Sequence, residues 1–209
     1  MKSGNIIFDL DGTLYDTEKV SVEALQTALS KFGVDDISDE EIKGQFGEVT
    51  DVIVRNLVPD RDEDFYSDLK EEIKYQEEKL IPMKGKLYDG IKELLEELYR
   101  EGYTISICSN GREKYIENVL DTTDIRKFFT HIRGNRPGKS KAFQLRKIVD
   151  GSDLESSVMV GDRYHDIEAA KEVGIPSIGA AYGFGNEEVE SADYIARRPS
   201  DIVKIVKKV

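Results

Sequence analysis

Two carboxylates, Asp9 and Asp11, stand two residues apart where an apolar run of the chain ends. That run, Ile6-Ile7-Phe8, predicts a buried strand, so both aspartates fall in the loop that follows it. One carboxylate can attack phosphorus, and a second carboxyl group can protonate the leaving oxygen and later deprotonate water. The spacing therefore predicts a nucleophile and acid–base pair, with two solvated turn aspartates as the alternative.

Gly12 and Thr13 complete this loop. A glycine allows the chain to curl tightly and to point several N–H groups inward, which creates a concavity that binds anions. Two anionic carboxylates would repel an incoming phosphate. We therefore expect a hard divalent cation with oxygen ligands, most plainly Mg²⁺, to neutralise them and to polarise the phosphoryl group.

Two further predicted strands also end in polar side chains. Ser109 and Asn110 follow the run 104–108, and a hydroxyl with the next N–H can hold a phosphate oxygen, although a turn serine fits equally well. Asp162 follows the run 158–160, and Asp166 lies four residues further on. This spacing suits a metal site, whereas a helix N-cap is the alternative.

Predicted helices and strands alternate along the chain from Tyr88 onward. The predicted strands are residues 104–108, 128–132, 158–160 and 177–180, with helices over 91–101, 142–149 and 166–173. This alternation favours right-handed crossovers and a parallel sheet. We therefore expect an α/β protein with a doubly wound, Rossmann-like core that binds its ligand at the carboxyl ends of the strands.

The segment between the first strand and this core has helical periodicity and no convincing strand. Apolar residues recur at helical spacing at Val22, Leu25, Leu29 and Phe32, and a second amphipathic face runs from Leu69 to Leu80 until Pro82 interrupts it. Ser38 and Glu41 predict a capping box at the start of a short helix, and Thr50 could cap another. We therefore expect an inserted helical domain over residues 16–87, with the catalytic core formed by residues 1–15 and 88–209.

Composition narrows the classes of partner and location. The chain has 209 residues and a formal net charge of -12, which opposes nucleic acid as the main partner. The single cysteine, Cys108, excludes an internal disulfide framework and fits a reducing interior. No apolar run reaches membrane-spanning length and no signal peptide precedes the first strand, so we expect a cytoplasmic protein without a membrane partner. The sequence predicts no oligomeric state.

Four segments in order resemble the motifs of the haloacid dehalogenase-like hydrolase superfamily. They are residues 9–14, Ser109-Asn110, a lysine within 138–141, and residues 161–166. The helical segment resembles the helical cap of that superfamily. Residues 176–179 and 182–185 are similar to its phosphoglycolate phosphatase-like branch.

The resemblance implies a role for each residue of the first motif. Asp9 would be the nucleophile and a metal ligand, and Asp11 would be the acid and base and would bind the metal through its backbone oxygen. Thr13 would position Asp11 or the phosphate. An acid at position 11 also separates this chain from the dehalogenases, which lack one there, so phosphorus is the expected electrophile.

The other motifs imply the rest of the site. Ser109, with Asn110, would bind the phosphoryl oxygens, and Asp162 would bind Mg²⁺. Asp166 would support the metal directly or through water.

The lysine motif departs from the common Lys-Pro pair, because Pro137 precedes Gly138-Lys139-Ser140-Lys141. A cation is needed to offset the carboxylates and the phosphate. We favour Lys141, which follows a plausible N-cap, with Lys139 as the alternative. The basic run 133–146 is interpreted as a solvated cleft edge or a rim that attracts phosphate.

These features together predict a Mg²⁺-dependent phosphatase that acts on a small phosphorylated metabolite through an aspartyl-phosphate, with phosphoglycolate as the leading substrate. A phosphosugar mutase and a non-catalytic binding protein are the alternatives. We expect substrate choice to reside in the loop 44–48 of the cap and in Arg55 on the helix after it.

Overall fold

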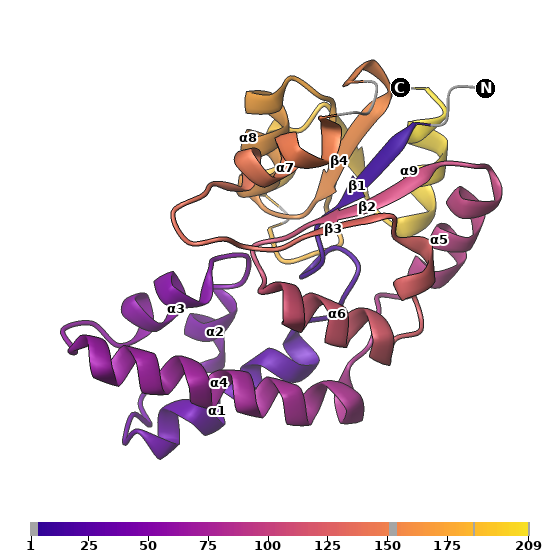
Figure 1. The fold of residues 1–209 in the computed structure, drawn as a ribbon. Coiled ribbons are helices and arrows are strands. Elements are labelled where there is room, and N and C mark those ends of the chain that lie inside the picture. The colour runs from indigo at the N-terminus through magenta and orange to yellow at the C-terminus, as the bar shows by residue number, and fades with distance from the viewer. Residues whose placement is uncertain (1–3, 151–153, 186, 209) are drawn as a thin grey trace.

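The computed structural model describes residues 4–150, 154–185 and 187–208. Within these residues, six strands form one parallel sheet in the order β3-β2-β1-β4-β5-β6 (Figure 1). The strands are β1 (Asn5–Phe8), β2 (Thr104–Cys108), β3 (His131–Arg133), β4 (Ser157–Gly161), β5 (Ser177–Ala180) and β6 (Tyr194–Ala196). The strand order reverses direction between β1 and β4, and ligands of doubly wound sheets bind at such a point. The predicted fold class is confirmed.

The central strand β1 buries both of its faces. Ile6 and Phe8 pack into one hydrophobic cluster and Ile7 into another, because successive side chains of a strand point to opposite faces. Two layers of helix cover these faces (Figure 1). One layer holds α5 (Ile91–Arg100) and α9 (Pro199–Val206), and the other holds α7 (Lys141–Val149) and α8 (Tyr164–Val173). The helix α6 (Glu113–Thr122) lies between the sheet and the inserted helices.

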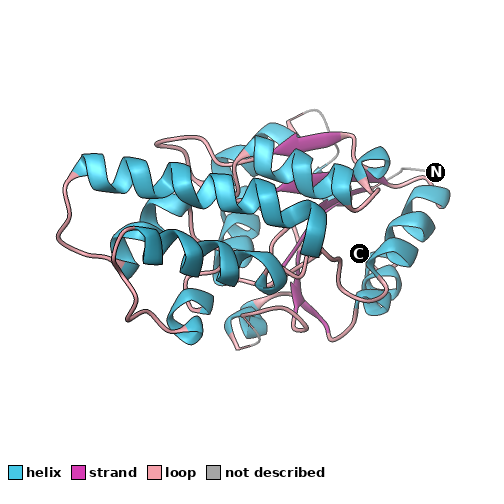
Figure 2. Ribbon diagram, turned by 90° about the horizontal axis from the view of Figure 1, so that it is seen from below, coloured by secondary structure: helices cyan, strands magenta, loops and turns pink. Residues whose placement is uncertain are grey.

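Four helices occupy the segment between β1 and α5. They are α1 (Glu18–Lys31), α2 (Asp39–Lys43), α3 (Thr50–Leu57) and α4 (Glu63–Lys84). Figure 2, seen from below, shows them in front of the strands, and they have a hydrophobic cluster of their own from Leu25 to Ile73. Val20 and Leu80, at the ends of α1 and α4, pack instead with the core. These contacts support our proposal of a cap over residues 16–87, which we call the cap below.

Several local predictions are confirmed by the structure. Ser38 and Glu41 form the capping box of α2, Ser140 caps α7 by accepting from the N–H of Phe143, and α8 ends at Val173, where the predicted helix ends. Each of these signals depends on residues within a few positions of one another. A local pattern is therefore sufficient to predict them.

Other local predictions are wrong. The helix α3 is capped by Val49, with Thr50 as its first residue, and α4 continues through Pro82 to Lys84. The strand predicted over 128–132 begins only at His131, because Phe128 belongs to a short 3-10 helix, Arg126–Phe128, whose apolar side chain packs in the core. Short apolar runs indicate burial more reliably than they indicate a strand. The strand β6 and the helices α6 and α9 were not predicted.

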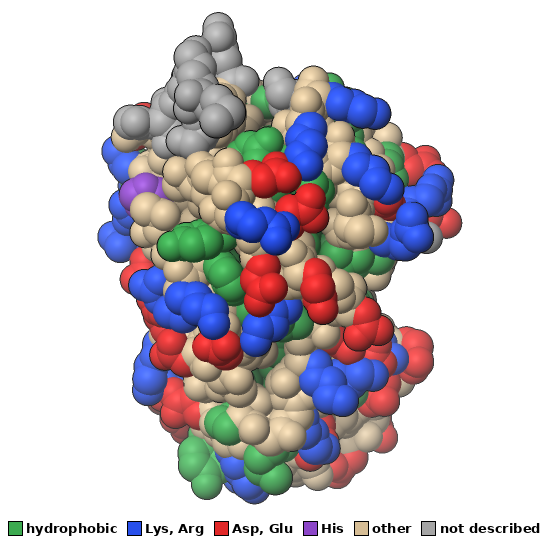
Figure 3. All heavy atoms as spheres, turned by 90° about the vertical axis from the view of Figure 1, so that its right-hand side faces the viewer, with side chains coloured by type: hydrophobic (Ala, Val, Ile, Leu, Met, Phe, Trp, Pro, Cys, Tyr) green, Lys and Arg blue, Asp and Glu red, His purple; other side chains and the backbone are tan. Residues whose placement is uncertain are grey.

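No helix of the described ranges is long and apolar enough to cross a membrane. Figure 3 shows acidic and basic side chains interspersed on the face that carries α5 and α6, with hydrophobic side chains only in small groups. This face therefore presents no large surface of one charge.

Candidate active site

Three strand ends bring the predicted polar residues together. Asp9 follows β1, Ser109 follows β2 and Asp162 follows β4, and these strands are adjacent and parallel. The backbone N–H of Asp9 donates to the carbonyl of Val160 over 2.8 Å, so the loop after β1 stays against β4. Residues far apart in the sequence therefore meet at one edge of the sheet.

Lys141 lies at the centre of this edge. Its Nζ is 2.7 Å from Oδ1 of Asp9 and 2.6 Å from Oδ1 of Asp166, and its side chain is 7% exposed. Burial alone would lower the pKa of Lys141, but the carboxylates of Asp166 and Asp9 hold it above its ordinary value. Lys139 is exposed, with its Nζ 4.8 Å from the ring centre of Phe143. The geometry thus favours Lys141 of the two predicted alternatives.

Asp9, Asp162 and Asp166 form a buried cluster in which each offers a carboxylate oxygen within 4.8 Å of the others. Burial, together with the neighbouring Asp166, raises the pKa of Asp162 to about 7. Burial likewise raises the pKa of Asp9 well above its usual value, whereas Lys141 opposes the change. Three carboxylates against one lysine leave an excess of negative charge that a divalent cation would balance. Oxygen donors of this type fit Mg²⁺, so the residues fit the predicted metal.

Asp162 is held by groups from two loops. The hydroxyl of Thr13 donates to its Oδ1 over 3.2 Å, and the N–H of Phe184 donates to its Oδ2 over 2.8 Å. Gly12 has a φ of 77° and packs so closely on Asp162 that no Cβ would fit there. The structure therefore places Thr13 on Asp162, and Thr13 does not line the pocket described below. Its predicted role in positioning Asp11 or the phosphate stays a prediction.

Asp166 occupies the first turn of α8 rather than its N-cap. Its Oδ2 accepts from the N–H of Arg163 over 3.1 Å, and its Oδ1 pairs with Lys141. Gly161 leaves room for this carboxylate, because a Cβ there would overlap it. The ammonium of Lys141 would compete with a metal cation for Oδ1 of Asp166, whereas the donors to Asp162 are neutral. This difference favours support of a metal by Asp166 through water over direct coordination.

Asp11 turns toward the cap side of the site. Its Oδ1 accepts from the hydroxyl of Thr17 over 2.7 Å and from the hydroxyl of Tyr115 over 2.6 Å. Burial raises the pKa of Asp11, and these two hydrogen bonds oppose the change. Neither donor was predicted. Thr17 is close in sequence but has no distinguishing motif, and Tyr115 arrives from α6, which only the tertiary fold brings near.

Ser109 and Asn110 line a pocket between the core and the cap. The Oγ of Ser109 accepts from the N–H of Gly111 over 3.0 Å, and Nδ2 of Asn110 donates to the carbonyl of Gly47 in the cap over 2.8 Å. The pocket is lined by the two carboxylates after β1, by cap residues and by the segment from the loop after β2 into α6: Asp9, Asp11, Thr17, Ser21, Leu25, Phe46, Gly47, Glu48, Thr50, Ile53, Ile73, Glu77, Ser109, Asn110, Gly111, Arg112 and Tyr115.

The cap loop predicted to read the substrate reaches this pocket with Phe46, Gly47 and Glu48. Oε1 of Glu48 also lies 2.9 Å from Nε2 of His165, so this histidine connects the core to the cap. The loop is therefore well placed for a role in substrate choice, which stays a prediction.

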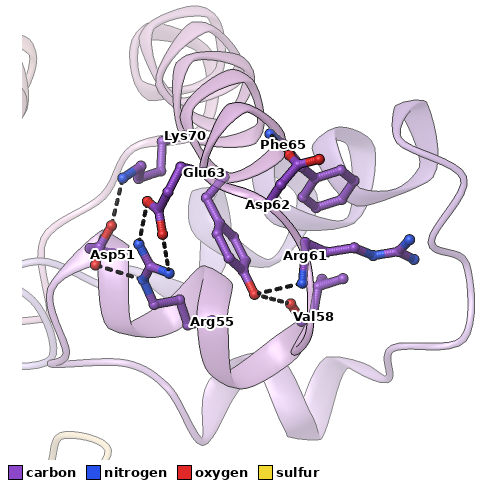
Figure 4. A network of polar contacts seen from close by, with 9 residues as sticks. Asp51, Arg55, Val58, Arg61, Asp62, Glu63, Phe65 and Lys70 are labelled. Atoms are coloured by element: carbon purple, nitrogen blue, oxygen red, sulfur yellow. Dashed lines mark hydrogen bonds and ion pairs between the residues drawn. The ribbon is translucent and has the colours of Figure 1, made fainter.

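Arg55 lies away from the pocket. It pairs with Asp51 and Glu63 and its guanidinium lies 4.4 Å from the ring centre of Tyr66, within the network that Figure 4 shows. Its groups hold α3 against the start of α4, and it is absent from the pocket lining. The predicted role of Arg55 in specificity therefore has no support in the geometry.

The remaining candidates have structural surroundings. Cys108 is fully buried, and burial raises the pKa of its thiol to about 12, which fits a small core side chain. His131 is exposed on β3. Neither contributes to the cluster of carboxylates.

Comparison with known proteins identifies the family of this chain. A family model described as haloacid dehalogenase-like hydrolase matches residues 6–180. The chain is 29% identical to a phosphoglycolate phosphatase of Vibrio parahaemolyticus, and the match covers 96% of this chain and 95% of that protein. It is 28% identical to the pyrophosphatase PpaX of Listeria innocua, with 99% of this chain and 97% of that protein covered. A crystal structure of a putative phosphatase from Clostridium difficile has a TM-score of 0.84 and 26% identity, with 99% of each chain covered.

The protein belongs to the haloacid dehalogenase-like hydrolase family. It is a phosphatase, and its similarity to phosphoglycolate phosphatases supports the branch that the sequence predicted.

Proposed function

We propose that this phosphatase hydrolyses a small phosphate monoester through an aspartyl-phosphate on Asp9, with Mg²⁺ as its metal and phosphoglycolate as the leading substrate. The observation that carries the proposal is the position of Lys141, whose Nζ joins Asp9 and Asp166 beside Asp162. A cation at this place offsets charge on both the nucleophile and the incoming phosphate. A cytoplasmic location, expected from the sequence, forms part of the proposal.

The first step is attack by the carboxylate of Asp9 on phosphorus, which forms the acyl phosphate as the bond to the leaving oxygen breaks. Asp11 gives its proton to that oxygen. Burial supports this role, because it raises the pKa of Asp11 and favours the protonated acid. In the second step Asp11 accepts a proton from water, and the water oxygen displaces Asp9 from phosphorus to release inorganic phosphate.

Ser109 and Asn110 are the residues that we assign to the phosphoryl oxygens, since both line the pocket beside Asp9. Asp9, Asp162 and the backbone oxygen of Asp11 would hold Mg²⁺, with Asp166 in support. When bound, the metal would neutralise the carboxylates and polarise the phosphoryl group. The cap would exclude water from the pocket while Asp9 reacts.

The test is release of inorganic phosphate from a panel of small phosphate monoesters and pyrophosphate, with and without Mg²⁺. We expect release that requires Mg²⁺ and that Asp9→Asn lowers by several orders of magnitude, since an amide lacks the anionic nucleophile. Asp64→Asn, in the first turn of α4, is the matched control. Conversion of a phosphosugar to its isomer without net phosphate release would favour a mutase, and an Asp9→Asn variant with more than about a hundredth of parent activity would exclude Asp9 as the nucleophile.

A further inference from the structure

The pocket between the core and the cap has a single cationic side chain among the residues described as lining it, Arg112. Four lining residues are acidic, namely Asp9, Asp11, Glu48 and Glu77. Much of the remaining cap side of the wall is apolar, formed by Leu25, Phe46, Ile53 and Ile73. Among these lining residues, Arg112 is therefore the one whose charge would attract an anionic group on the leaving part of a substrate.

Arg112 is well placed to receive such a group. It is the next residue after Ser109-Asn110-Gly111, so it is close in sequence to the residues that we assign to the phosphoryl oxygens, and it lines the same pocket. It is also the N-cap residue of α6, and its side chain makes no capping bond. Its side chain is 36% exposed, which leaves it accessible from the pocket.

The guanidinium of Arg112 has one acidic partner within the described chain. Its Nη2 donates to Oε2 of Glu77 over 2.7 Å, and Glu77 belongs to α4 of the cap. A guanidinium has five N–H donors in a planar fork, so this bond leaves most of its capacity for a carboxylate or a phosphate. Burial raises the pKa of Glu77 to about 7 in spite of Arg112, which weakens Glu77 as a charged competitor near neutral pH.

We propose that Arg112 selects substrates carrying a second anionic group, a carboxylate or a phosphate, beside the phosphoryl group that is transferred. This inference rests on the proposed phosphatase function. When no substrate is bound, Glu77 orients the side chain of Arg112 across the boundary between core and cap. In the complex, the second anion of the substrate replaces or joins Glu77 as the partner of the Arg112 guanidinium. Substrates with a neutral leaving group make no such ion pair.

The experiment compares 2-phosphoglycolate with 2-hydroxyethyl phosphate, in which an alcohol replaces the carboxylate, and includes pyrophosphate as a third substrate. The measured quantity is the ratio of kcat/KM for each anionic substrate to kcat/KM for 2-hydroxyethyl phosphate. We expect Arg112→Gln to lower at least one ratio by about tenfold or more, since a neutral amide cannot form the ion pair with the second anion. A fall for 2-phosphoglycolate identifies a carboxylate as the second anion, and a fall for pyrophosphate identifies a phosphate.

Two other variants separate recognition from structural support. Arg55→Gln removes an arginine that is ion-paired outside the pocket and should leave both ratios as in the parent. Glu77→Gln removes the competing carboxylate and should raise the ratio that Arg112→Gln lowers. Ratios that change by less than about twofold in Arg112→Gln, or that fall equally in Glu77→Gln, would overturn the inference.

Failure of the inference is distinguishable from failure of the proposed function. If the parent releases phosphate from 2-hydroxyethyl phosphate and the anionic substrates, but Arg112→Gln lowers all three equally, the phosphatase function stands and the selective role of Arg112 does not. If the parent releases phosphate from none of the three, the proposed function fails first.

Discussion

The hydroxyl of Tyr115 donates to Oδ1 of Asp11 over 2.6 Å, although 104 residues separate the two in the sequence. Thr17 donates to the same oxygen from the start of the cap. Both bonds stabilise the charged carboxylate and so oppose the effect of burial on the pKa of Asp11. Tyr115 therefore positions the proposed acid and base and also limits how readily it stays protonated.

Tyr115→Phe should lower kcat for alkyl phosphates by roughly tenfold, because Asp11 loses one of two hydrogen bonds that fix its orientation. Aryl phosphates should be affected less, since their leaving oxygens need less protonation. Steady-state kinetics on both substrate types measures the difference. Tyr99→Phe is the matched control, because Tyr99 is 60% exposed on α5. Equal effects of the two variants would exclude a positioning role for Tyr115.

Lys141→Met should lower kcat/KM by at least about a hundredfold, since it removes the buried cation that pairs with Asp9 and Asp166. Lys139→Met should stay within about twofold of the parent, because its ammonium lies on the exposed face of Phe143. Phosphate release gives the rates, and circular dichroism checks that both variants fold. A larger loss in the Lys139 variant would reverse the assignment.

Residues at the predicted strand ends could be located from sequence because their signals are local. Asp9 and Asp162 each follow an apolar run, and parallel strands bring such ends to one edge of a sheet. The parallel direction of the strands also follows from the alternation of helices and strands, whereas their order in the sheet was not predicted. This part of the site therefore needed no knowledge of tertiary contacts.

The rest of the site depends on packing that no local pattern encodes. Tyr115 and Glu77 reach the pocket because α6 packs against α4, and neither helix carries a motif for that contact. In the sequence, Lys139 and Lys141 offer the same positive charge to the site. Only the position of Lys141 at the start of α7 distinguishes it from Lys139. Arg55 was predicted to take part in substrate choice because it is a cationic residue close in sequence to the cap loop. The structure instead pairs it with Glu63 inside the cap, a contact that the sequence does not indicate.

Asp162→Asn should weaken Mg²⁺ binding, measured by calorimetry without substrate, because one carboxylate of the buried cluster loses its charge. Asp166→Asn should weaken binding less, since the ammonium of Lys141 already pairs with Asp166, but it should lower kcat because Lys141 loses a charged partner. EDTA should abolish activity, and Ca²⁺ should restore it poorly because of its longer bonds. Parent-like Mg²⁺ affinity in the Asp162 variant would remove that residue from the metal site.

Glu77 gives the metal-free protein a pH-dependent stability whose sign follows from its raised pKa. Burial raises the pKa of Glu77 from 4.5 to about 7, so the folded state binds this proton more tightly than the unfolded state does. The free energy of unfolding contributed by Glu77 therefore falls as the pH rises from about 4.5 to about 7 and stays constant above that. A shift of this size corresponds to roughly 3 kcal/mol.

Glu77→Gln cannot titrate, so its stability relative to the parent should rise over the same pH window and then level off. Urea unfolding of both proteins in EDTA, at intervals from pH 4.5 to 8, measures this difference. Glu78→Gln is the matched control, because the hydrogen bond from Lys114 holds the pKa of the exposed Glu78 below its ordinary value of 4.5. The contribution of Glu78 to stability therefore changes only below this window, and the difference between Glu78→Gln and the parent should stay flat across it. If the stability difference between Glu77→Gln and the parent does not change with pH, the ion pair with Arg112 fully offsets the effect of burial on the pKa of Glu77. Glu77 would then be a fully charged carboxylate near neutral pH and would compete with the substrate anion for Arg112.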